Sequence, residues 1–444
     1  MKQLLFIIAL GCTLAASAQT YTLQQLKDSA LHNNITLRNA QRSIAAAQQQ
    51  RKEAFTKYFP NISGTGAWFN ANKSMAKMDV NPSEYISPEL GMSLAQSLPA
   101  EAVAALGSPI SMSMIKNGTI AGVNAVQPVF AGGQIINGNK LAKVGEEVSR
   151  LQLRLSENEV ERQTEQYYWQ LTSLQEKMKT IEAVQELLSD IYKDVEVAVL
   201  AGLVMRNDLL QVQLRQNDVE SQKLKVQNGI SILRLLLAQY CGLKNTDFTL
   251  ACNTEVLSPL AQKQDHEQAL LGTAEYQLLS KQVEAANLQK KMTIGQSLPT
   301  VAVGAGYNYH NLLDNNRSFG MVFATVSVPI SDWWGGSHAI KRKKIEYQKA
   351  VDEQEDKSQL LCIRMQNAWN NVEESYQQLQ IAQRSIEQST ENLRLNREYY
   401  RAGTSKMSDL LEAQMLYQQA LDHRTDAYAE YQNKLLEYRQ ATGQ

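Results

Sequence analysis

Residues 201–210 read AGLVMRNDLL and residues 402–411 read AGTSKMSDLL, so one motif occurs twice at an offset of 201 positions. Pro128 and Pro329 stand at the same offset. A second pair of matching segments further upstream is offset by 239, so the first copy carries 38 extra residues. The chain is therefore predicted to contain two long units of one architecture, joined head to tail.

Both units contain a long stretch without proline, at residues 129–258 and after residue 329. Because proline breaks helix interiors, these stretches can form very long helices. Each contains a seven-residue repeat, which is typical of helices that pack as coiled coils along their whole length. The repeat positions are Leu153, Val160, Tyr167, Leu174, Ile181, Leu188 and Val195, then Val351, Ser358, Met365, Val372, Leu379, Ile386, Leu393 and Tyr400. At about 1.5 Å per residue, each helix would be roughly 100 Å long.

Each long helix ends at a glycine, Gly202 or Gly403, and a second helical pattern begins a few residues later. Thr404 and Ser408 are the candidate N-caps of the last helix. Each unit is therefore predicted to end in a helical hairpin whose tip carries a glycine.

The segments ahead of the long helices have the period of β-strands. In 300–310, bulky residues alternate with small or polar ones, which suits a strand with one lipid face. A polar loop, 311–318, leads to a second strand that begins at Phe319. The first unit has a weaker pair of strands at 61–70 and 119–129.

Four strands cannot close a barrel, whose practical minimum is about eight. Open strand edges in lipid would also leave backbone groups unpaired. The chain is therefore expected to oligomerise, so that each copy contributes strands to one shared barrel and helical hairpins to one tube. Trp333 and Trp334 follow the last strand and are predicted to form an aromatic girdle at the membrane interface.

The insertion of the first unit falls roughly within residues 71–118, a segment that holds four of the nine prolines and five of the thirteen methionines. We interpret them as a long loop outside the membrane that folds over or into a pore. A methionine copper site is the sharper alternative, and methionine as a gap filler in a loop-borne helix is the simpler one. The methionines are Met75, Met78, Met92, Met112 and Met114.

The N-terminus predicts export. Residues 1–18 combine an early lysine, an apolar run and an Ala-Ser-Ala end, as a signal peptide does. Without Lys2 the chain has 43 basic and 45 acidic residues, a balance that argues against nucleic-acid binding. No later apolar run reaches the length of a membrane-spanning helix. A Cys241–Cys252 disulfide, with Cys362 buried in the heptad helix, is the pairing that an oxidising compartment would permit.

No catalytic, cofactor or metal site is predicted, and the chain is not expected to be an enzyme. The five histidines lack metal-ligand spacing, and neither a nucleophile elbow nor a phosphate-binding glycine loop is present.

The signal peptide, the duplicated unit of two strands and a long helical hairpin, and the tip motif at 402–413 together resemble the TolC family of outer-membrane efflux proteins. The resemblance covers essentially the whole mature chain, as a first repeat at 19–258 and a second at 259–444. It implies a homotrimer with a twelve-stranded outer-membrane barrel that continues into a helical tunnel across the periplasm. The implied function is the exit duct of a tripartite efflux or type I secretion system, with a periplasmic adaptor and an inner-membrane transporter as partners.

The resemblance also gives residues a role. Asp409 and Glu412 match two acidic rings that line the closed periplasmic aperture, and they lie three apart on one helix face. Tyr400 aligns with a tyrosine that helps to hold the aperture closed, and Asp208 occupies the corresponding place at the other tip. The sequence departs from the family at Ser405, where a latching arginine would stand, and Lys406 or Arg206 is the candidate substitute.

The adaptor is expected to contact the two tips, at Ala201, Gly202 and Arg206 and at Ala402, Gly403 and Lys406. Two alternatives remain. Acidic residues in the first turns of a helix also interact favourably with its dipole without any gate. A non-conducting periplasmic coiled-coil adaptor or scaffold would use the same hairpins, although such adaptors usually have one hairpin beside compact β domains.

Overall fold

A computed structural model describes residues 19–106, 108–251, 260–312, 315–330 and 332–444. The predicted signal peptide and the predicted boundary between the repeats lie outside these ranges. The chain divides into two compact units. Unit 1 holds the residues up to Gln48, Val144–Glu284 and Gln348–Gln444, and unit 2 holds Gln49–Lys143 and Ala285–Tyr347. Each compact unit therefore takes residues from both sequence repeats.

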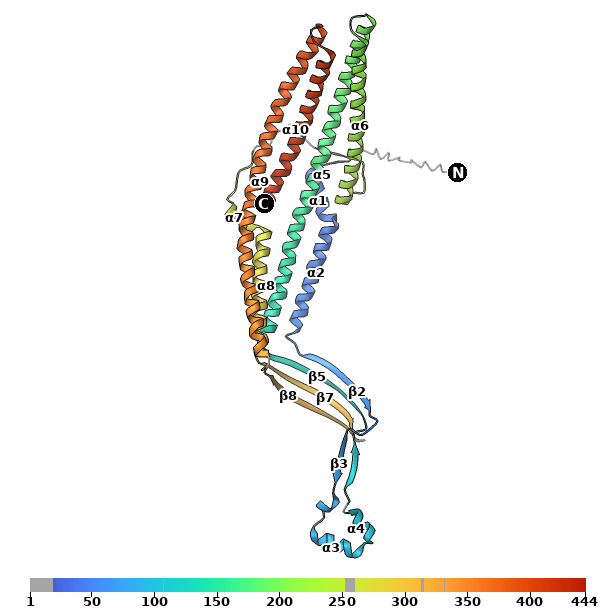
Figure 1. The fold of residues 1–444 in the computed structure, drawn as a ribbon, viewed down its shortest axis with the longest axis vertical. Coiled ribbons are helices and arrows are strands. Elements are labelled where there is room, and N and C mark those ends of the chain that lie inside the picture. Colours follow the sequence, from blue (N-terminus) through green and yellow to red (C-terminus); the bar gives the residue numbers. More distant parts are fainter. Residues whose placement is uncertain (1–18, 107, 252–259, 313–314, 331) are drawn as a thin grey trace, which may run out of the picture. The chain divides into compact units, whose positions relative to one another are not determined.

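The chain repeats one order of elements, two helices, two strands and two long helices, as Figure 1 shows. The first copy consists of α1 (Leu23–Asn33), α2 (Ile35–Thr56), β2 (Asn61–Asn70), β5 (Asn117–Ala131), α5 (Gln134–Leu200) and α6 (Arg206–Cys241). The second consists of α7 (His266–Gly272), α8 (Ala274–Gln296), β7 (Thr300–Leu312), β8 (Asn315–Ser327), α9 (Asp332–Arg401) and α10 (Met407–Ala441). The predicted duplicated architecture is confirmed.

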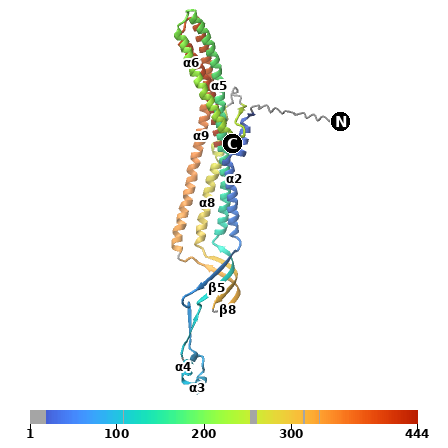
Figure 2. The same cartoon turned by 90° about the vertical axis from the view of Figure 1, so that its right-hand side faces the viewer.

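The long helices have the predicted length, and their heptad positions are buried or half-buried except Val351, which is exposed. Helix α5 has 67 residues and α9 has 70. The heptad residues Val160 and Leu188 on α5 and Met365 and Val372 on α9 are fully buried. Helices α5 and α6 lie side by side as a hairpin (Figure 2), with Val219 of α6 in the same apolar cluster as Leu188. Packing of the repeat, rather than the weak preference of each residue for helix, holds such helices together.

The main core of unit 1 ties the N-terminal segment to the long helices. Strand β1 (Gln19–Tyr21) pairs in parallel with β6 (Phe248–Leu250). Lys27 of α1 forms an ion pair with one carboxylate oxygen of Glu165 on α5. The other oxygen of Glu165 accepts a hydrogen bond from the indole N–H of Trp169 at 3.1 Å. The buried carboxylate is thus both paired and hydrogen-bonded, as a low-dielectric site requires.

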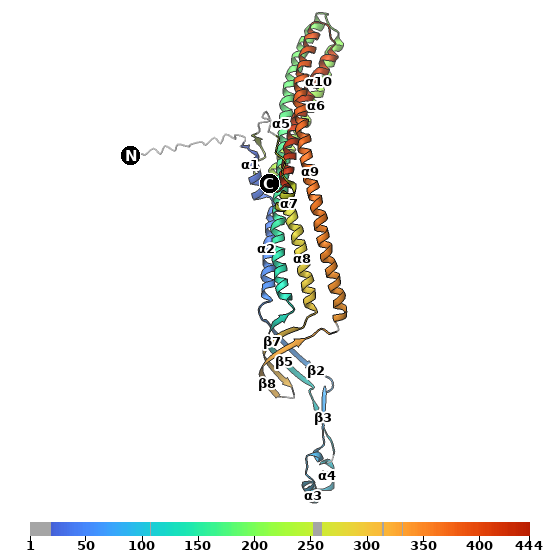
Figure 3. The same ribbon diagram turned by 90° about the vertical axis from the view of Figure 1, so that its left-hand side faces the viewer.

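Unit 2 contains a four-stranded antiparallel sheet in the order β2-β5-β7-β8 (Figure 3). The central pair, β5 with β7, joins the two repeats and is interrupted by a bulge between Pro128 and Phe130, where proline in a strand is tolerated. The pairing register places one set of exposed apolar side chains on a single face of the sheet, which we call the apolar face. It comprises Ile62, Trp68, Val123, Val303, Tyr307, Val322 and Val326.

The other face explains why small residues alternate with bulky ones in β7. A Cβ on Gly304 would lie within 2.3 Å of the ring of Phe323, so this aromatic side chain covers the glycine. Phe323 of β8 and Tyr307 of β7 therefore lie on different faces of the sheet. The predicted polar loop at 311–318 is wrong in extent, because β7 runs to Leu312 and β8 begins at Asn315.

The insertion also has more structure than the predicted loop. It forms a hairpin of β3 (Ala76–Val80) and β4 (Ile110–Met114), with a 3-10 turn (Pro82–Glu84) and the helices α3 (Pro88–Ser97) and α4 (Ala100–Leu106) between them. Ser87 caps α3 by accepting from the backbone N–H of Leu90. Proline at the start of α3 is compatible with a helix, because the first turn lacks backbone partners.

Among the described helices, none has a stretch long and apolar enough to cross a bilayer. The thiol of Cys241 is buried in unit 1, and burial raises its pKa to about 12. Cys362 is half-buried, so the prediction that it is buried is wrong. Cys252, the predicted disulfide partner, lies outside the described residues.

Candidate functional site

The two hairpin tips have the same backbone geometry. Gly202 and Gly403 adopt left-handed φ angles of 71° and 74°. At the first tip the N–H of Leu203 donates to the carbonyl of Ala198, and at the second the N–H of Thr404 donates to that of Tyr399, both at 2.9 Å. These bonds satisfy the last carbonyls of α5 and α9, and glycine is favoured because a Cβ is strained at this φ. The predicted glycine-marked tips are confirmed.

The predicted N-caps of the last helix are wrong. Lys406 is the N-cap of α10, in an extended conformation, and Ser408 lies inside the helix. The hydroxyl of Thr404 donates instead to the carbonyl of Tyr399, at 3.0 Å, and so belongs to the end of α9. A hydroxyl between two helices can bond either to the last carbonyls of the first helix or to the first N–H groups of the second. The sequence pattern alone cannot tell which of these it does.

Asp409 and Glu412 are both exposed on α10. One carboxylate oxygen of Asp409 accepts from the backbone N–H of Lys406 at 3.3 Å, and the other accepts from the Ser408 hydroxyl at 3.1 Å. Asp409 therefore stabilises the start of its own helix. Glu412 lies one turn further along the same helix, so a second negative charge stands near the first.

Asp208 and Tyr400 come from different hairpins and lie close enough to interact. Asp208 is in the first turn of α6, and Tyr400 is in the last turn of α9. The Tyr400 hydroxyl is buried and has no hydrogen-bond partner among the described residues. Burial, and then the charge of Asp208, raise the pKa of Tyr400. The tertiary structure thus brings together two residues that the sequence separates by almost 200 positions.

A polar contact that the sequence analysis missed joins the hairpins just behind the tips. Arg215 of α6 donates to Gln414 at 3.0 Å and to Gln418 at 2.8 Å, both on α10. Gln418 in turn donates to Gln222 of α6 at 2.9 Å. The sequence did contain a signal for this contact. Arg215 is spaced by three and four residues from the core positions Val212 and Val219, so it lies on the same helix face as they do. Burial lowers the pKa of Arg215, while the neighbouring Asp218 acts in the opposite direction.

The candidate substitutes for the latching arginine, Arg206 and Lys406, are exposed. Among the described residues, neither forms an ion pair between the hairpins. Arg401 does, since it lies 3.4 Å from Asp194 of α5. This contact and the Arg215 network connect the same two hairpins.

The surfaces of the two tips differ in chemistry. The first tip exposes large apolar side chains, with Leu200 83%, Leu203 78% and Met205 77% exposed. The corresponding turn of the second tip, after Gly403, carries Thr404, Ser405 and Lys406. All six residues predicted to contact an adaptor lie at these tips, and each tip residue Ala201, Gly202, Ala402 and Gly403 is exposed.

The predicted aromatic girdle lies on a helix rather than at a strand end. Trp333 and Trp334 belong to the first turn of α9. The Trp333 side chain lies outside the described part of the structure, and that of Trp334 is 78% exposed. A second aromatic cluster consists of Phe55, in the last turn of α2, with Tyr58 and Phe59, which lie between α2 and β2.

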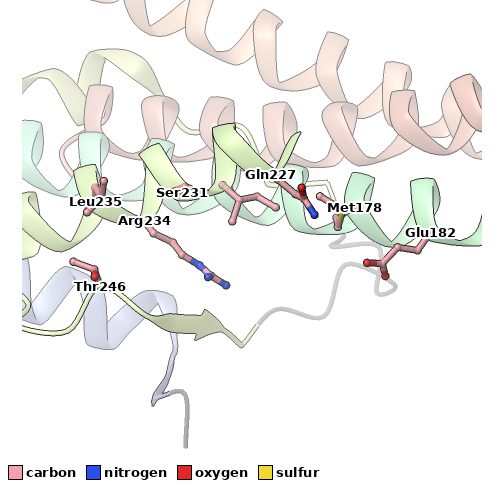
Figure 4. A pocket seen from close by; sticks show the side chains of 8 residues that line it. Met178, Glu182, Gln227, Ser231, Arg234, Leu235 and Thr246 are labelled. Atoms are coloured by element: carbon pink, nitrogen blue, oxygen red, sulfur yellow. The ribbon is translucent and has the colours of Figure 1, made fainter. Parts of the chain in front are cut away.

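An open pocket of about 360 Å³ lies beside α5 and α6 in unit 1 (Figure 4). Arg234 and Glu182 contribute the charged groups of its lining, and Met178 and Leu235 contribute apolar surface. Arg234 also approaches Asp247, at 3.4 Å. The pocket contains none of the predicted site residues. Within the described ranges, no three His, Cys, Asp or Glu side chains are grouped as metal ligands would be.

Residues 267–444 match the family model described as outer membrane efflux protein. The match lies in the second repeat, and over these residues the chain is similar to outer membrane efflux proteins. The predictions of this family, of the outer membrane location and of extension into the periplasm are confirmed. The family is one of transport proteins and not of enzymes. No curated protein matches the sequence significantly.

Several solved structures have the fold of this chain. The CmeC outer membrane channel of Campylobacter jejuni has a TM-score of 0.74 at 15% identity, covering 95% of this chain and 85% of that one. The outer membrane protein VceC of Vibrio cholerae has a TM-score of 0.72 at 15% identity, covering 95% and 96%. The MtrE outer membrane channel of Neisseria gonorrhoeae, in its open state, has a TM-score of 0.74 at 15% identity, covering 95% and 88%. At this identity the likeness concerns the fold.

Proposed function

We propose that the protein is the outer-membrane exit duct of a tripartite efflux or type I secretion system. Three copies would close their sheets and hairpins into one conduit that substrates cross passively, from the periplasm to the exterior. The open edges of β2 and β8, beside the apolar face, support this assembly, because an unpaired edge in lipid is costly. A periplasmic adaptor and an inner-membrane transporter would supply docking and energy.

The observation that carries the proposal is the set of acidic and aromatic residues at the hairpin tips. Asp409 and Glu412 expose two carboxylates per chain, so threefold symmetry would place six of them around one aperture. Such a ring attracts cations and repels anions, and more strongly in a constriction than in bulk water. Tyr400 and Asp208, together with the Arg215 and Arg401 contacts, would hold the hairpins in the closed arrangement.

The test is single-channel recording of the mature protein in a planar bilayer of neutral lipid. We expect small, cation-selective openings. The double variant Asp409→Asn, Glu412→Gln should lose most of this cation preference, as read from the reversal potential in a salt gradient. Glu373→Gln, Glu374→Gln is the matched control, since both residues are exposed in the middle of α9.

Two results would overturn parts of the proposal. An unchanged reversal potential in the tip variant would remove Asp409 and Glu412 from the aperture. A folded oligomer that never conducts, even after removal of the insertion, would favour the non-conducting scaffold.

A further inference from the structure

The helix ends that adjoin the sheet carry an excess of positive charge, which we call the basic belt. It comprises residues 49–60, 132–143, 285–299 and 328–347, with eleven basic and three acidic side chains. The whole chain, by contrast, holds 44 basic and 45 acidic residues. The excess is therefore local to these four segments, all of which belong to unit 2.

The charges of the belt are accessible and only partly neutralised. Lys341, Arg342 and Lys344 are exposed, and Lys343 is half-buried. Glu346 is 3.7 Å from Arg342 and 2.5 Å from Lys343, so one carboxylate serves two cations. Across the described ranges, no carboxylate is paired with Lys341 or Lys344.

The basic side chains of the belt point in several directions around their helices, so they cannot all line a single cavity. Successive residues of an α-helix point about 100° apart, so the four consecutive basic residues 341–344 cover most of the circumference of α9. The adjacent pairs Arg51-Lys52 on α2 and Lys290-Lys291 on α8 also diverge for this reason. Lys290 also lies over the ring of Tyr347, 4.0 Å from its centroid, so a cation–π contact connects α8 with α9.

The order of surface chemistry in unit 2 is that of a membrane interface. The sheet presents its apolar face, and exposed aromatic residues follow where strands and helices meet, at Phe55, Phe59 and Trp334. The basic belt comes next along the helices. Apolar, aromatic and basic layers in this order match the hydrocarbon, the interface and the headgroups of a bilayer.

The distances suit lipid headgroups. Lys290 and Lys291 lie in the last two turns of α8, and Lys341 to Lys344 lie about three turns into α9. These positions are roughly 10 to 18 Å of helix from the strands. The headgroup layer is about 5–8 Å thick, and electrostatic attraction reaches about 8 Å further, which is the Debye length. Lysine side chains are long and flexible enough to cover the rest of the distance.

We propose that the basic belt binds the phosphate groups of anionic phospholipids in the periplasmic leaflet of the outer membrane. The proposal rests on the outer membrane location and is independent of conduction or gating. Its partner is an anionic lipid surface rather than a soluble anionic cargo, because the charges surround the helices next to an apolar sheet face.

The test is lipid selectivity of the reconstituted full-length mature protein, measured by electron spin resonance with spin-labelled phosphatidylglycerol and phosphatidylcholine. Wild type should prefer phosphatidylglycerol. The variant Lys341→Glu, Lys344→Glu should reduce this preference by about fivefold or more for each residue near the surface. Lys225→Glu, Arg384→Glu is the matched control, because both residues are exposed in unit 1. It should leave the preference unchanged.

Wild type gives an independent arm if the variant does not assemble. Raising the salt concentration from about 0.1 M to 1 M shortens the Debye length to about 3 Å and should abolish most of the preference. Equal association of the two lipids with wild type at low salt would overturn the proposal. A second result would also overturn it. If the Lys341→Glu, Lys344→Glu variant kept its lipid preference but shifted the reversal potential in neutral bilayers, the two lysines would face the conduit instead of the lipid.

Discussion

The guanidinium of Arg215 on α6 donates to the amide oxygen of Gln414 on α10 at 3.0 Å, so a polar bond joins the two hairpins inside an apolar seam. Gln414 is fully buried. Its amide nitrogen has no hydrogen-bond partner among the described residues, so the bond from Arg215 is what satisfies the buried side chain at its oxygen. Loss of Arg215 would leave this oxygen unsatisfied as well.

Arg215→Met should therefore destabilise the hairpin pair. The variant leaves the Gln414 oxygen buried without its donor, which costs about 1–3 kcal/mol. We expect a lower temperature of thermal unfolding and larger or more frequent channel openings. Arg384→Met, at an exposed position of α9, is the control. Identical unfolding of both variants would show that the contact contributes nothing.

Two helical glycines should respond to alanine with opposite signs. A Cβ on Gly295 of α8 would lie 2.3 Å from the carbonyl oxygen of Gly132, a backbone atom that cannot rotate away. Gly295→Ala should thus destabilise unit 2. At Gly145 on α5, no heavy atom lies within 4 Å of the place that a Cβ would take, so Gly145→Ala should stabilise the helix by about 0.5–1 kcal/mol. Thermal unfolding of the two variants measures both effects, and a shift of the same sign in both would contradict the packing.

The variant Tyr400→Phe tests whether the Tyr400 hydroxyl acts within one chain or through a contact with a neighbouring copy. The hydroxyl is buried without a partner among the described residues, so its removal should leave the protomer unchanged or stabilise it by about 1 kcal/mol. A neighbouring copy in a closed aperture would supply the partner, and the variant should then conduct more. Tyr399→Phe, at an exposed neighbouring position, is the control. Unchanged conductance with unchanged unfolding would remove the Tyr400 hydroxyl from the gate.

Replacement of residues 72–115 by Asn-Gly should preserve the sheet. The last pair of the β2–β5 ladder is Asn70 with Asn117, and the N–H of Ala71 still meets the carbonyl of Lys116, at 2.8 Å. A two-residue Asn-Gly turn suits such a hairpin. We expect a heat-modifiable outer-membrane oligomer on gels, as for wild type. Loss of the oligomer would instead make the insertion part of the assembly.

The Cys241 thiol should be almost inert toward iodoacetamide in the folded, reduced protein. Its pKa of about 12 leaves roughly one thiolate in ten thousand at pH 8. Because the folded pKa exceeds the ordinary value of 9.0, the stability from the buried neutral thiol is present below pH 9 and is lost as pH rises toward 12. Peptide mapping of alkylated protein at pH 8 checks this, with Cys362 as the internal comparison. Fast labelling of Cys241 would contradict its burial.

Local patterns predicted the elements better than the junctions between them. The heptads of α5 and α9, the tip glycines and the duplicated order depend on period and backbone conformation, which neighbouring residues determine. The predicted caps at Thr404 and Ser408 and the loop at 311–318 were wrong. Both lie where two elements compete for the same groups, and tertiary pairing decides which element wins.

The sequence by itself determined the two repeats, the helical hairpins and the acidic residues near their tips, because these follow from periodicity, glycine placement and charge along the chain. Only the tertiary structure placed Tyr400 beside Asp208 and Arg215 beside Gln414, since these pairs depend on how one hairpin packs on the other. It also gathered the apolar face and the basic belt in unit 2. Surfaces of this kind come from segments distant in sequence, and strand register and helix packing alone bring them together.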